Sequence, residues 1–364
     1  MKISNSLPAW TIAAPIAAWL LLAGKAAGLD QMLGGAYIAL LAAGLFAGVL
    51  AAVFHAEVVA HRIGEPYGTL VLAVAVTSIE VALIVSLMIA GGETTTGLAR
   101  DTVYAAVMLI LNGMVGICLL AGARRHGEQR FTQTGVSAAL ATLSAIAVLT
   151  MVLPNYTTTT PGPYYSGSQL VFIAVISLVL YGTFVLVQTV RHRDYFLPEV
   201  ATADEAVHAP PPSRKIMWWS CALLLACLGS VVLLAKSLSP PLEAAVLALG
   251  APKALVGIII AAVVLLPEGI AAFQAARANR LQTSLNLALG SALASIGLTI
   301  PAVAIVSLAN GWTLSLGIDV KSTVLLLLSI IVATISLGNG RTTIMQGMVH
   351  VVIFAVYLFV TIVP

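Results

Sequence analysis

The sequence predicts an all-α polytopic membrane protein with about eleven transmembrane helices, arranged as one leading helix and two inverted five-helix repeats. Composition is the first observation behind this prediction. Hydrophobic residues make up 60% of the chain, charged residues make up 9%, and the mean hydropathy is +1.04. Such values lie far outside the range of soluble domains. The lengths of the apolar runs and an internal similarity between two halves of the chain are the other two observations.

Most of the apolar runs reach the ~20 residues that a helix needs to cross the hydrocarbon core of a bilayer. Each run is rich in Ala, Leu, Val and Ile, and polar segments separate it from the next. The predicted spans lie near residues 8–24, 33–54, 67–90, 102–123, 134–153, 168–190, 216–236, 253–276, 283–309, 318–337 and 343–363.

One polar segment divides the spans into two groups. Residues 191–215, RHRDYFLPEVATADEAVHAPPPSRK, are acidic and Pro-rich, which is typical of a solvated hinge. The predicted organisation is therefore a leading helix (1–30), a first five-helix repeat (31–190), a cytoplasmic linker (191–215) and a second five-helix repeat (216–364). A cation-sensing role for the linker, through Asp204, Glu205 and His208, is the less favoured alternative.

Basic residues between the spans predict the orientation in the membrane. With the N-terminus in the cytoplasm, twelve of the seventeen Lys and Arg residues fall in inner segments and five fall in outer loops. Positive residues are retained on the cytoplasmic side, so the N-terminus is predicted inside and the C-terminus outside. The net charge of +3 reflects this topology, and the sequence has no basic face of the kind that binds nucleic acid.

Two carboxylates lie inside predicted spans. Glu80 is in the third span and Glu268 is in the eighth, and neither span has a Lys or Arg close to its carboxylate. A charge at the middle of a bilayer costs ~2.5 to 3.5 kcal/mol on insertion scales, so such residues usually mark an ion or proton pathway. A permanently protonated carboxyl that bonds to a neighbouring helix is the alternative, and two carboxylates in matching places argue against it.

The two glutamates occupy similar sequence contexts. Gly64-Glu65-Pro66 precedes Glu80, Gly250-Ala251-Pro252 precedes Glu268, and a span rich in small residues follows each glutamate. The step from the third span to the eighth is odd, so the two helices must cross the membrane in opposite directions. This is the inverted-repeat plan of secondary transporters, in which substrate binds at the midplane. The polar residues of these following spans, and so the candidates to line a path, are Asn112 in the first half and Asn286, Ser291 and Ser295 in the second.

The residues around both glutamates favour a hard cation. Pro267 removes a backbone donor and frees the carbonyl of Val263, so we expect a kink or break at this point. Hydroxyl groups of Thr77 and Ser78 are further candidate ligands, although such hydroxyls often bond to their own helix. Carboxylate, amide, hydroxyl and carbonyl oxygens suit Ca²⁺ or Na⁺. No soft-metal cluster and no cofactor is predicted.

Glu57 and His61 lie four residues apart near the end of the second span, and so on one helix face. A cytoplasmic vestibule that relays protons or cations is one interpretation of this pair. An interfacial cluster whose long side chains reach toward water is the other.

Three features of the chain resemble the Ca²⁺/H⁺ antiporter family of the cation/Ca²⁺ exchanger superfamily, and within it the bacterial ChaA-type Na⁺(K⁺)/H⁺ and Ca²⁺/H⁺ antiporters. They are EVVAHRIGEPYGTLVLAVAVTSIE, PEGIAAFQAARANRLQTSLNLALGSALASIGLTIP and the arrangement of spans around an acidic linker. The resemblance implies that Glu80 and Glu268 bind a cation and exchange it for protons, with Asn112, Ser291 and Ser295 lining the path. It also favours Glu57 as a vestibule acid.

The chain departs from the family pattern at the glutamates. The family usually has G-N-x-x-E, whereas here the residues are VTSIE up to Glu80 and VLLPE up to Glu268, and Gly269 stands where many relatives have His. Losing two amide ligands weakens the expected Ca²⁺ shell, so Na⁺ and K⁺ are also expected substrates.

The predicted function is an antiporter in a bacterial inner membrane that exports Ca²⁺, Na⁺ or K⁺ for protons and supports cation homeostasis and alkaline pH tolerance. A passive cation channel is the main alternative, although a channel usually builds a ring of acids from identical subunits. A membrane-embedded hydrolase is the weaker alternative, since neither glutamate shares its span with a His. The sequence leaves the preferred ion, the stoichiometry and the oligomeric state open.

Overall fold

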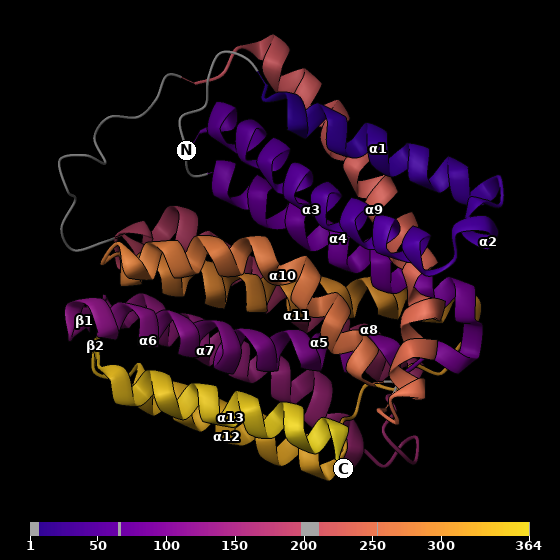
Figure 1. The fold of residues 1–364 in the computed structure, drawn as a ribbon. Coiled ribbons are helices and arrows are strands. Elements are labelled where there is room, and N and C mark those ends of the chain that lie inside the picture. Colours follow the sequence, from indigo (N-terminus) through magenta and orange to yellow (C-terminus); the bar gives the residue numbers. More distant parts are fainter. Residues whose placement is uncertain (1–6, 65–66, 198–210, 253, 364) are drawn as a thin grey trace. The chain divides into compact units, whose positions relative to one another are not determined.

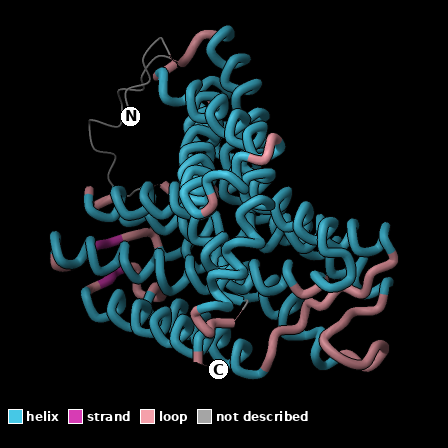
Figure 2. Tube along the Cα trace, turned by 45° about the vertical axis from the view of Figure 1, so that its right-hand side comes forward, coloured by secondary structure: helices cyan, strands magenta, loops and turns pink. Residues whose placement is uncertain are grey.

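The computed structural model describes residues 7–64, 67–197, 211–252 and 254–363, and almost all of this chain is helical (Figure 2). Each predicted span corresponds to a helix or to consecutive helical segments. Ten helical stretches are long and apolar enough to cross a membrane, and the shorter Val320–Ser336 matches the remaining prediction. The all-α polytopic prediction is therefore confirmed. In chain order the elements are α1 (Ala9–Ala26), α2 (Leu29–Leu33), α3 (Gly35–Ile63), α4 (Tyr67–Gly91), η1 (Gly92–Thr95), α5 (Leu98–Met108), η2 (Leu109–Met114), α6 (Val115–His126), β1 (Gln129–Arg130), α7 (Gln133–Ala147), η3 (Val148–Val152), η4 (Leu153–Tyr156), α8 (Gly167–Leu186), η5 (Val187–Arg191), η6 (Arg193–Phe196), α9 (Arg214–Ala248), α10 (Ala254–Arg277), α11 (Leu281–Asn310), α12 (Val320–Ser336), β2 (Arg341–Thr342) and α13 (Ile344–Ile362).

The helices form two compact units that do not follow the two halves of the sequence. Unit 1 contains residues 1–86 and 201–256, and unit 2 contains residues 87–200 and 257–364. Each unit therefore combines chain from both sides of the linker. The sequence halves are defined by similarity and the units by packing, so the two divisions describe different properties of the chain.

Unit 1 is built around the packing of α1, α3 and α9 (Figure 1). Small residues on α3 allow the close approach of α9, because a Cβ atom added at Gly48 would lie only 3.0 Å from Val231. This is the usual way that membrane helices gain contact area, since lipid gives them no hydrophobic driving force to associate. One hydrophobic cluster in the core of this unit consists of Ala18, Tyr37, Leu41, Leu234 and Leu238.

Helix α9 is longer than predicted. The sequence predicts a span that ends at residue 236, before two prolines, whereas the helix continues through Pro240 and Pro241 to Ala248. Pro241 cannot donate to the carbonyl of Ser237 four residues earlier. The Lys25 Nζ donates to that carbonyl instead, at 3.2 Å. A neighbouring side chain thus satisfies the group that the proline leaves without its helical partner, and the helix persists.

The helices that precede the two glutamate helices end in the same manner. Gly64 follows α3 with a φ of +76°, and Gly250 follows α9 with a φ of +70°. Glycine is favoured at both places because residues with a side chain rarely adopt this conformation. These two glycines support the predicted similarity between the segments that precede Glu80 and Glu268. Glu65 and Pro66, which complete the first of the two motifs, lie outside the described residues.

Unit 2 is organised around α11, which packs on α5, α6, α7 and α8. Helix α13 packs on α6 and on the η2 turn, and α12 packs on α13 and α7 (Figure 1). Three segments of this unit, η2, η3 and η5, are single turns of π-helix that interrupt or end α-helices. Such turns add a residue to the helical turn and often occur at functional sites.

A short antiparallel ladder joins two loops at one end of unit 2. Gln129 pairs with Thr342 and Arg130 pairs with Arg341. The Gln129 side chain is buried, and its Nε2 donates to the Ala276 carbonyl at 2.9 Å and to Asn279 Oδ1 at 3.0 Å. This amide therefore links the loop before α7 to the end of α10, the helix that carries Glu268.

Replacing Gln129 with Leu is expected to destabilise the protein by about 0.5 to 1.5 kcal/mol, the usual net contribution of a hydrogen bond, because the Ala276 carbonyl loses one donor and keeps the Asn279 N–H. The measurement is the thermal unfolding of the purified protein in detergent. Gln133→Leu is the matched control, since Gln133 is exposed in the first turn of α7. Equal unfolding temperatures for the two variants would contradict the assigned role of Gln129.

The first part of the predicted linker, residues 191–197, is exposed except at one residue that packs on a helix. Residues Arg193–Phe196 form a short 3₁₀ helix, and Phe196 is buried against Phe184 with a ring separation of 5.8 Å. The acids and the histidine that the sensing hypothesis uses, Asp204, Glu205 and His208, lie outside the described residues.

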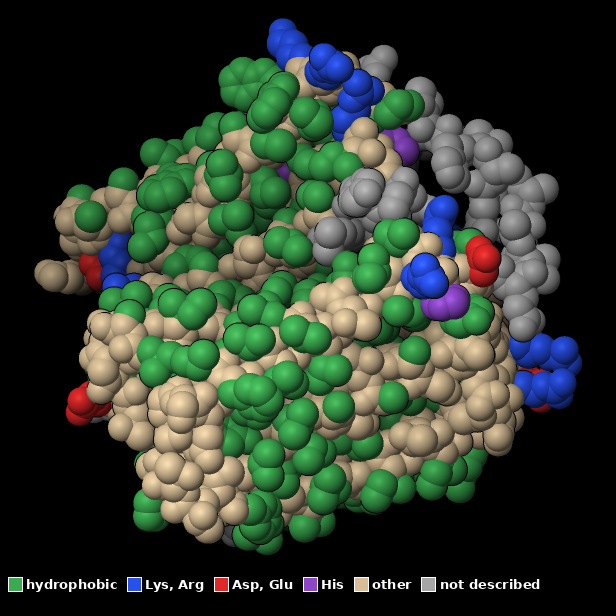
Figure 3. All heavy atoms as spheres, turned by 180° about the vertical axis from the view of Figure 1, so that it is seen from behind, with side chains coloured by type: hydrophobic (Ala, Val, Ile, Leu, Met, Phe, Trp, Pro, Cys, Tyr) green, Lys and Arg blue, Asp and Glu red, His purple; other side chains and the backbone are tan. Residues whose placement is uncertain are grey.

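The exposed surface carries many hydrophobic side chains, as a membrane protein requires. On the face drawn in Figure 3, hydrophobic side chains are spread over much of the surface, and Lys and Arg side chains gather at a few places near its edge. Large exposed hydrophobic side chains occur on most of the long helices. In a bilayer these side chains contact lipid.

Candidate functional site

Glu80 is a buried carboxylate in the middle of an apolar helix. It lies on α4 in unit 1 and is 5% exposed. Its neighbours Ile79, Leu83 and Ile84 are almost completely buried hydrophobic residues. A carboxylate among such residues pays a large desolvation cost when it ionises.

The hydroxyl groups of Thr77 and Ser78 bond back to their own helix. Thr77 Oγ1 donates to the Ala73 carbonyl at 2.9 Å, and Ser78 Oγ donates to the Val74 carbonyl at 2.6 Å. Each hydroxyl hydrogen is therefore used. Both oxygens keep lone pairs, which are what a cation would take.

Glu268 lies on α10, which continues through Pro267. The helix break that Pro267 led us to expect is therefore absent, although the proline still leaves the Val263 carbonyl without its usual helical donor. Glu268 is partly buried. A Cβ atom added at the adjacent Gly269 would lie 3.4 Å from Met114 Cε, so this part of α10 packs against the η2 turn.

Asn112 lies on that η2 turn and is fully buried. Its Nδ2 donates to Ser329 Oγ of α12 at 2.8 Å, and its Oδ1 lies 3.3 Å from Nδ1 of His350 on α13. Ser329 and His350 are both 0% exposed. The sequence analysis missed these two partners, and the available signal was weak, because each is a single polar residue in an apolar run.

The predicted path-lining residues of α11 differ in their surroundings. Ser295 is 1% exposed and Ser291 is partly buried. Asn286 uses both ends of its amide, because its Nδ2 donates to the Phe196 carbonyl at 2.6 Å and its Oδ1 accepts from Gln282 Nε2 at 2.9 Å. Asn286 therefore links α11 to η6, and its polar atoms are engaged by the chain itself.

Glu57 and His61 are both partly buried in the last turns of α3, in unit 1. Their four-residue separation on a continuous helix places them on one face. Arg62 lies in the same last turn.

The candidate residues divide between the two units. Unit 1 contains Glu57, His61, Thr77, Ser78 and Glu80. Unit 2 contains Asn112, Glu268, Asn286, Ser291 and Ser295, and within it Gly269 of α10 lies near Met114 of η2, the turn that also carries Asn112. In the part of the chain that the structure describes, no three His, Cys, Asp or Glu residues come together as a metal site.

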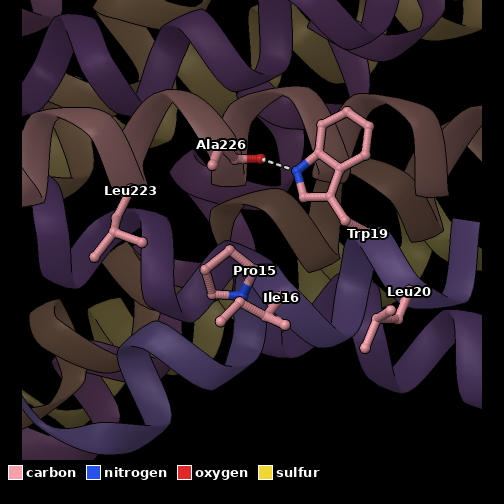
Figure 4. Close-up of a pocket in the computed structure, with 6 residues that line it drawn as sticks. All are labelled: Pro15, Ile16, Trp19, Leu20, Leu223 and Ala226. Carbon is pink, nitrogen blue, oxygen red and sulfur yellow. Dashed lines mark hydrogen bonds between the residues drawn. The ribbon is translucent and has the colours of Figure 1, made fainter.

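An apolar pocket of about 320 Å³ lies between α1 and α9 in unit 1 (Figure 4). Its lining includes Trp19, whose Nε1 donates to the Ala226 carbonyl at 3.0 Å. None of the candidate ion-binding residues lines this pocket, so it is separate from the candidate site. The other lining residues are Pro15, Ile16, Leu20 and Leu223.

Comparison with known proteins gives a family match on each side of the linker. The family described as sodium/calcium exchanger protein matches residues 33–190 and residues 218–363. These two segments contain all the candidate residues.

Two curated bacterial proteins are similar over most of their length. Protein y4hA of Sinorhizobium fredii, named for a presumed ionic transport function, is 52% identical over 327 residues, which cover 89% of this chain and 88% of the relative. The sodium-potassium/proton antiporter ChaA of Escherichia coli is 34% identical over 317 residues, which cover 86% of each chain.

A solved structure described as the H⁺/Ca²⁺ exchanger CAX has a similar fold. The TM-score is 0.67 at 16% identity, and the match covers 94% of this chain and 88% of the other. At this identity the likeness concerns the fold alone.

Proposed function

The chain belongs to the sodium/calcium exchanger protein family, and from this premise we propose that it is an antiporter that exports Ca²⁺, Na⁺ or K⁺ across a bacterial cytoplasmic membrane in exchange for protons. Membership makes the protein a multi-pass membrane exchanger, which agrees with its ten long apolar helices. Beyond family membership, we propose the transported ions, the direction of transport and the transport mechanism.

One observation carries the mechanism: Glu80 is 5% exposed among hydrophobic residues on a membrane-spanning helix. In such surroundings a carboxylate is stable either with a proton or with a cation, and one excludes the other. We assign the same competition to Glu268. Thr77, Ser78, Asn112, Ser291 and Ser295 would add neutral oxygen ligands along the path.

Competition of this kind couples the two fluxes. Protons that enter from the periplasm neutralise the carboxylates and release the cation outward. The protein then reorients, and the cytoplasm removes the protons, so that a new cation binds from inside. A site that holds neither protons nor cation carries buried negative charge and reorients poorly. In this scheme the N-terminus lies in the cytoplasm and the C-terminus in the periplasm, because the distribution of basic residues predicts that orientation.

The identity of the ion follows from the ligands. The family's usual Asn is replaced by Thr77 before Glu80 and by Leu265 before Glu268. Fewer amide oxygens weaken a Ca²⁺ shell, which takes six to eight oxygen ligands. Sodium and potassium are therefore substrates beside Ca²⁺, and the name of the 34% identical relative, a sodium-potassium/proton antiporter, supports this choice. Export of these cations for protons would serve cation homeostasis at alkaline pH.

A passive channel is the second candidate, and family membership argues against it. The two functions differ in one respect that can be measured. A channel conducts cations without any opposing movement of protons, whereas an antiporter cannot.

The proposal is tested with inside-out membrane vesicles in which respiration has built a pH gradient that quenches a fluorescent dye. With the membrane potential clamped, addition of CaCl₂, NaCl or KCl is expected to restore fluorescence when the protein is present. The cations that do so are its substrates. Vesicles without the protein are the control. If no cation moves protons, or if cations move without protons, the antiport proposal is wrong.

A further inference from the structure

The buried Asn112 amide has one allowed orientation, and Ser329 determines it. Ser329 Oγ lies 2.6 Å from the Leu325 carbonyl, which can only accept, so the hydroxyl hydrogen is used there. The same oxygen must therefore accept from its neighbour on η2, at 2.8 Å. Only the amide nitrogen of Asn112 can donate, and this places Nδ2 toward α12.

The orientation of Asn112 in turn determines the proton position on His350. Since Nδ2 faces Ser329, the atom that faces His350 Nδ1 at 3.3 Å is the oxygen Oδ1. An amide oxygen has no hydrogen to give, so Nδ1 of His350 carries the proton and donates. The chain of hydrogen bonds therefore runs from His350 through Asn112 to Ser329 and ends at the Leu325 carbonyl.

Close packing holds His350 in place for this contact. A Cβ atom added at Gly116 would lie 3.0 Å from the Cβ of His350, and one added at Gly113 would lie 3.3 Å from the ring of Phe354. Helix α13 thus rests directly on η2 and α6. His350, Asn112 and Ser329 are all 0% exposed, so their hydrogen bonds are shielded from bulk water.

We propose that His350 is a positioning residue for cation binding: its Nδ1–H holds the Asn112 carboxamide so that one lone pair of Oδ1 is fixed toward α13 and the other stays available to a cation. The inference rests on the proposed function, in which Asn112 lines the path. Groups that orient a ligand from behind commonly change metal affinity by about 10- to 100-fold when they are removed.

Two substitutions of His350 distinguish the loss of the hydrogen-bond donor from the loss of the imidazole ring. His350→Leu keeps the bulk and removes the donor. His350→Asn places an amide nitrogen at the same number of bonds from the backbone as Nδ1, so it restores the donor without a titratable ring. His55→Leu is the matched control, because His55 is another fully buried histidine, bonded to Ser220 and the Thr11 carbonyl in unit 1, with no contact to a candidate ligand.

The experiment measures the apparent KM and the maximal rate for each transported cation in the vesicle assay. His350→Leu is expected to raise KM about tenfold with little change in maximal rate, and His350→Asn is expected to return KM close to the wild-type value. His55→Leu should lower the unfolding temperature and leave KM unchanged. An unchanged KM in His350→Leu, or equal loss in His350→Leu and His350→Asn, would overturn the proposal.

A double substitution tests whether His350 acts through Asn112. The Asn112→Ala and His350→Leu changes together should give the KM of Asn112→Ala alone, because Asn112→Ala removes the group that His350 positions. Independent effects that multiply would overturn the proposal. The same four proteins, unfolded by heat in detergent, should show the same non-additivity without any transport. Wild-type vesicles that fail to exchange ions would therefore reject the proposed function, while the unfolding cycle would still decide whether His350 holds Asn112.

Discussion

Replacing Glu80 with Gln is expected to abolish coupled exchange, with a loss of at least about 100-fold, and replacing Glu268 with Gln should do the same. Glutamine has the shape of a protonated glutamate but can neither release a proton nor supply an anionic ligand. The loss should exceed the 10- to 100-fold effects typical of groups that only orient a ligand. The measurement is the cation-dependent recovery of dye fluorescence in inside-out vesicles.

The same substitutions should leave the fold intact. Because a buried carboxylate costs stability in a membrane, the neutral amide is expected to unfold at the same temperature as wild type or at a higher one. Glu93→Gln is the matched control for transport, since Glu93 is an exposed carboxylate directly after α4, and it should keep the wild-type rate. Coupled exchange that survives in Glu80→Gln or Glu268→Gln would remove that carboxylate from the mechanism.

Gly347→Ala is expected to cause a large loss of stability in unit 2. An added Cβ atom would lie 2.7 Å from the backbone nitrogen of Leu120 and 3.0 Å from the carbonyl oxygen of Gly116. Backbone atoms cannot rotate away as a side chain can, so α13 would have to separate from α6. Overpacking of this kind costs about 1 to 3 kcal/mol.

Gly182→Ala provides the comparison for Gly347→Ala. Gly182 is also a glycine inside a membrane-spanning helix, but no atom from another described part of the chain lies within 4 Å of the position that its Cβ would take. Both variants gain the same helix propensity, so the difference between their unfolding temperatures isolates the contact between α13 and α6. Equal temperatures would show that α13 does not pack as closely as the structure has it.

The spans could be predicted from the sequence because the requirement for about 20 apolar residues is a local property. The end of α9 could not be predicted in this way. Two prolines at 240 and 241 normally end a helix, and the Lys25 side chain, more than 200 residues away in sequence, donates to the carbonyl of Ser237 that Pro241 leaves without its helical donor. The π-helical turn at Leu109–Met114 was missed for a similar reason, since nothing in LILNGM distinguishes it from α-helix.

The candidate site shows the same difference between features that depend on local sequence and features that depend on distant residues. Glu80 and Glu268 could be selected as candidates because a lone carboxylate in an apolar span is rare and costly. Ser329 and His350 were missed because their role depends on Asn112, over 200 residues away in the chain. Asn286 was selected as a path-lining residue because it lies in the span that follows Glu268, and in the structure its amide bonds to the Phe196 carbonyl and to Gln282. Sequence identifies which polar residues are unusual, and tertiary contacts decide what they bind.

The composition of unit 1 has a consequence for how the protein is made. Helix α3 buries its glycine-rich face against Val231 and Leu234 of α9, and α9 leaves the ribosome only after the first six spans have been synthesised. During that interval the surface of α3 around Gly48 lacks its partner on α9, whereas Gly44 already lies beside Leu21 of α1. Unit 1 therefore completes its folding late, after insertion of the second half has begun, and a ribosome that stops at the linker leaves an unfinished product for membrane quality control.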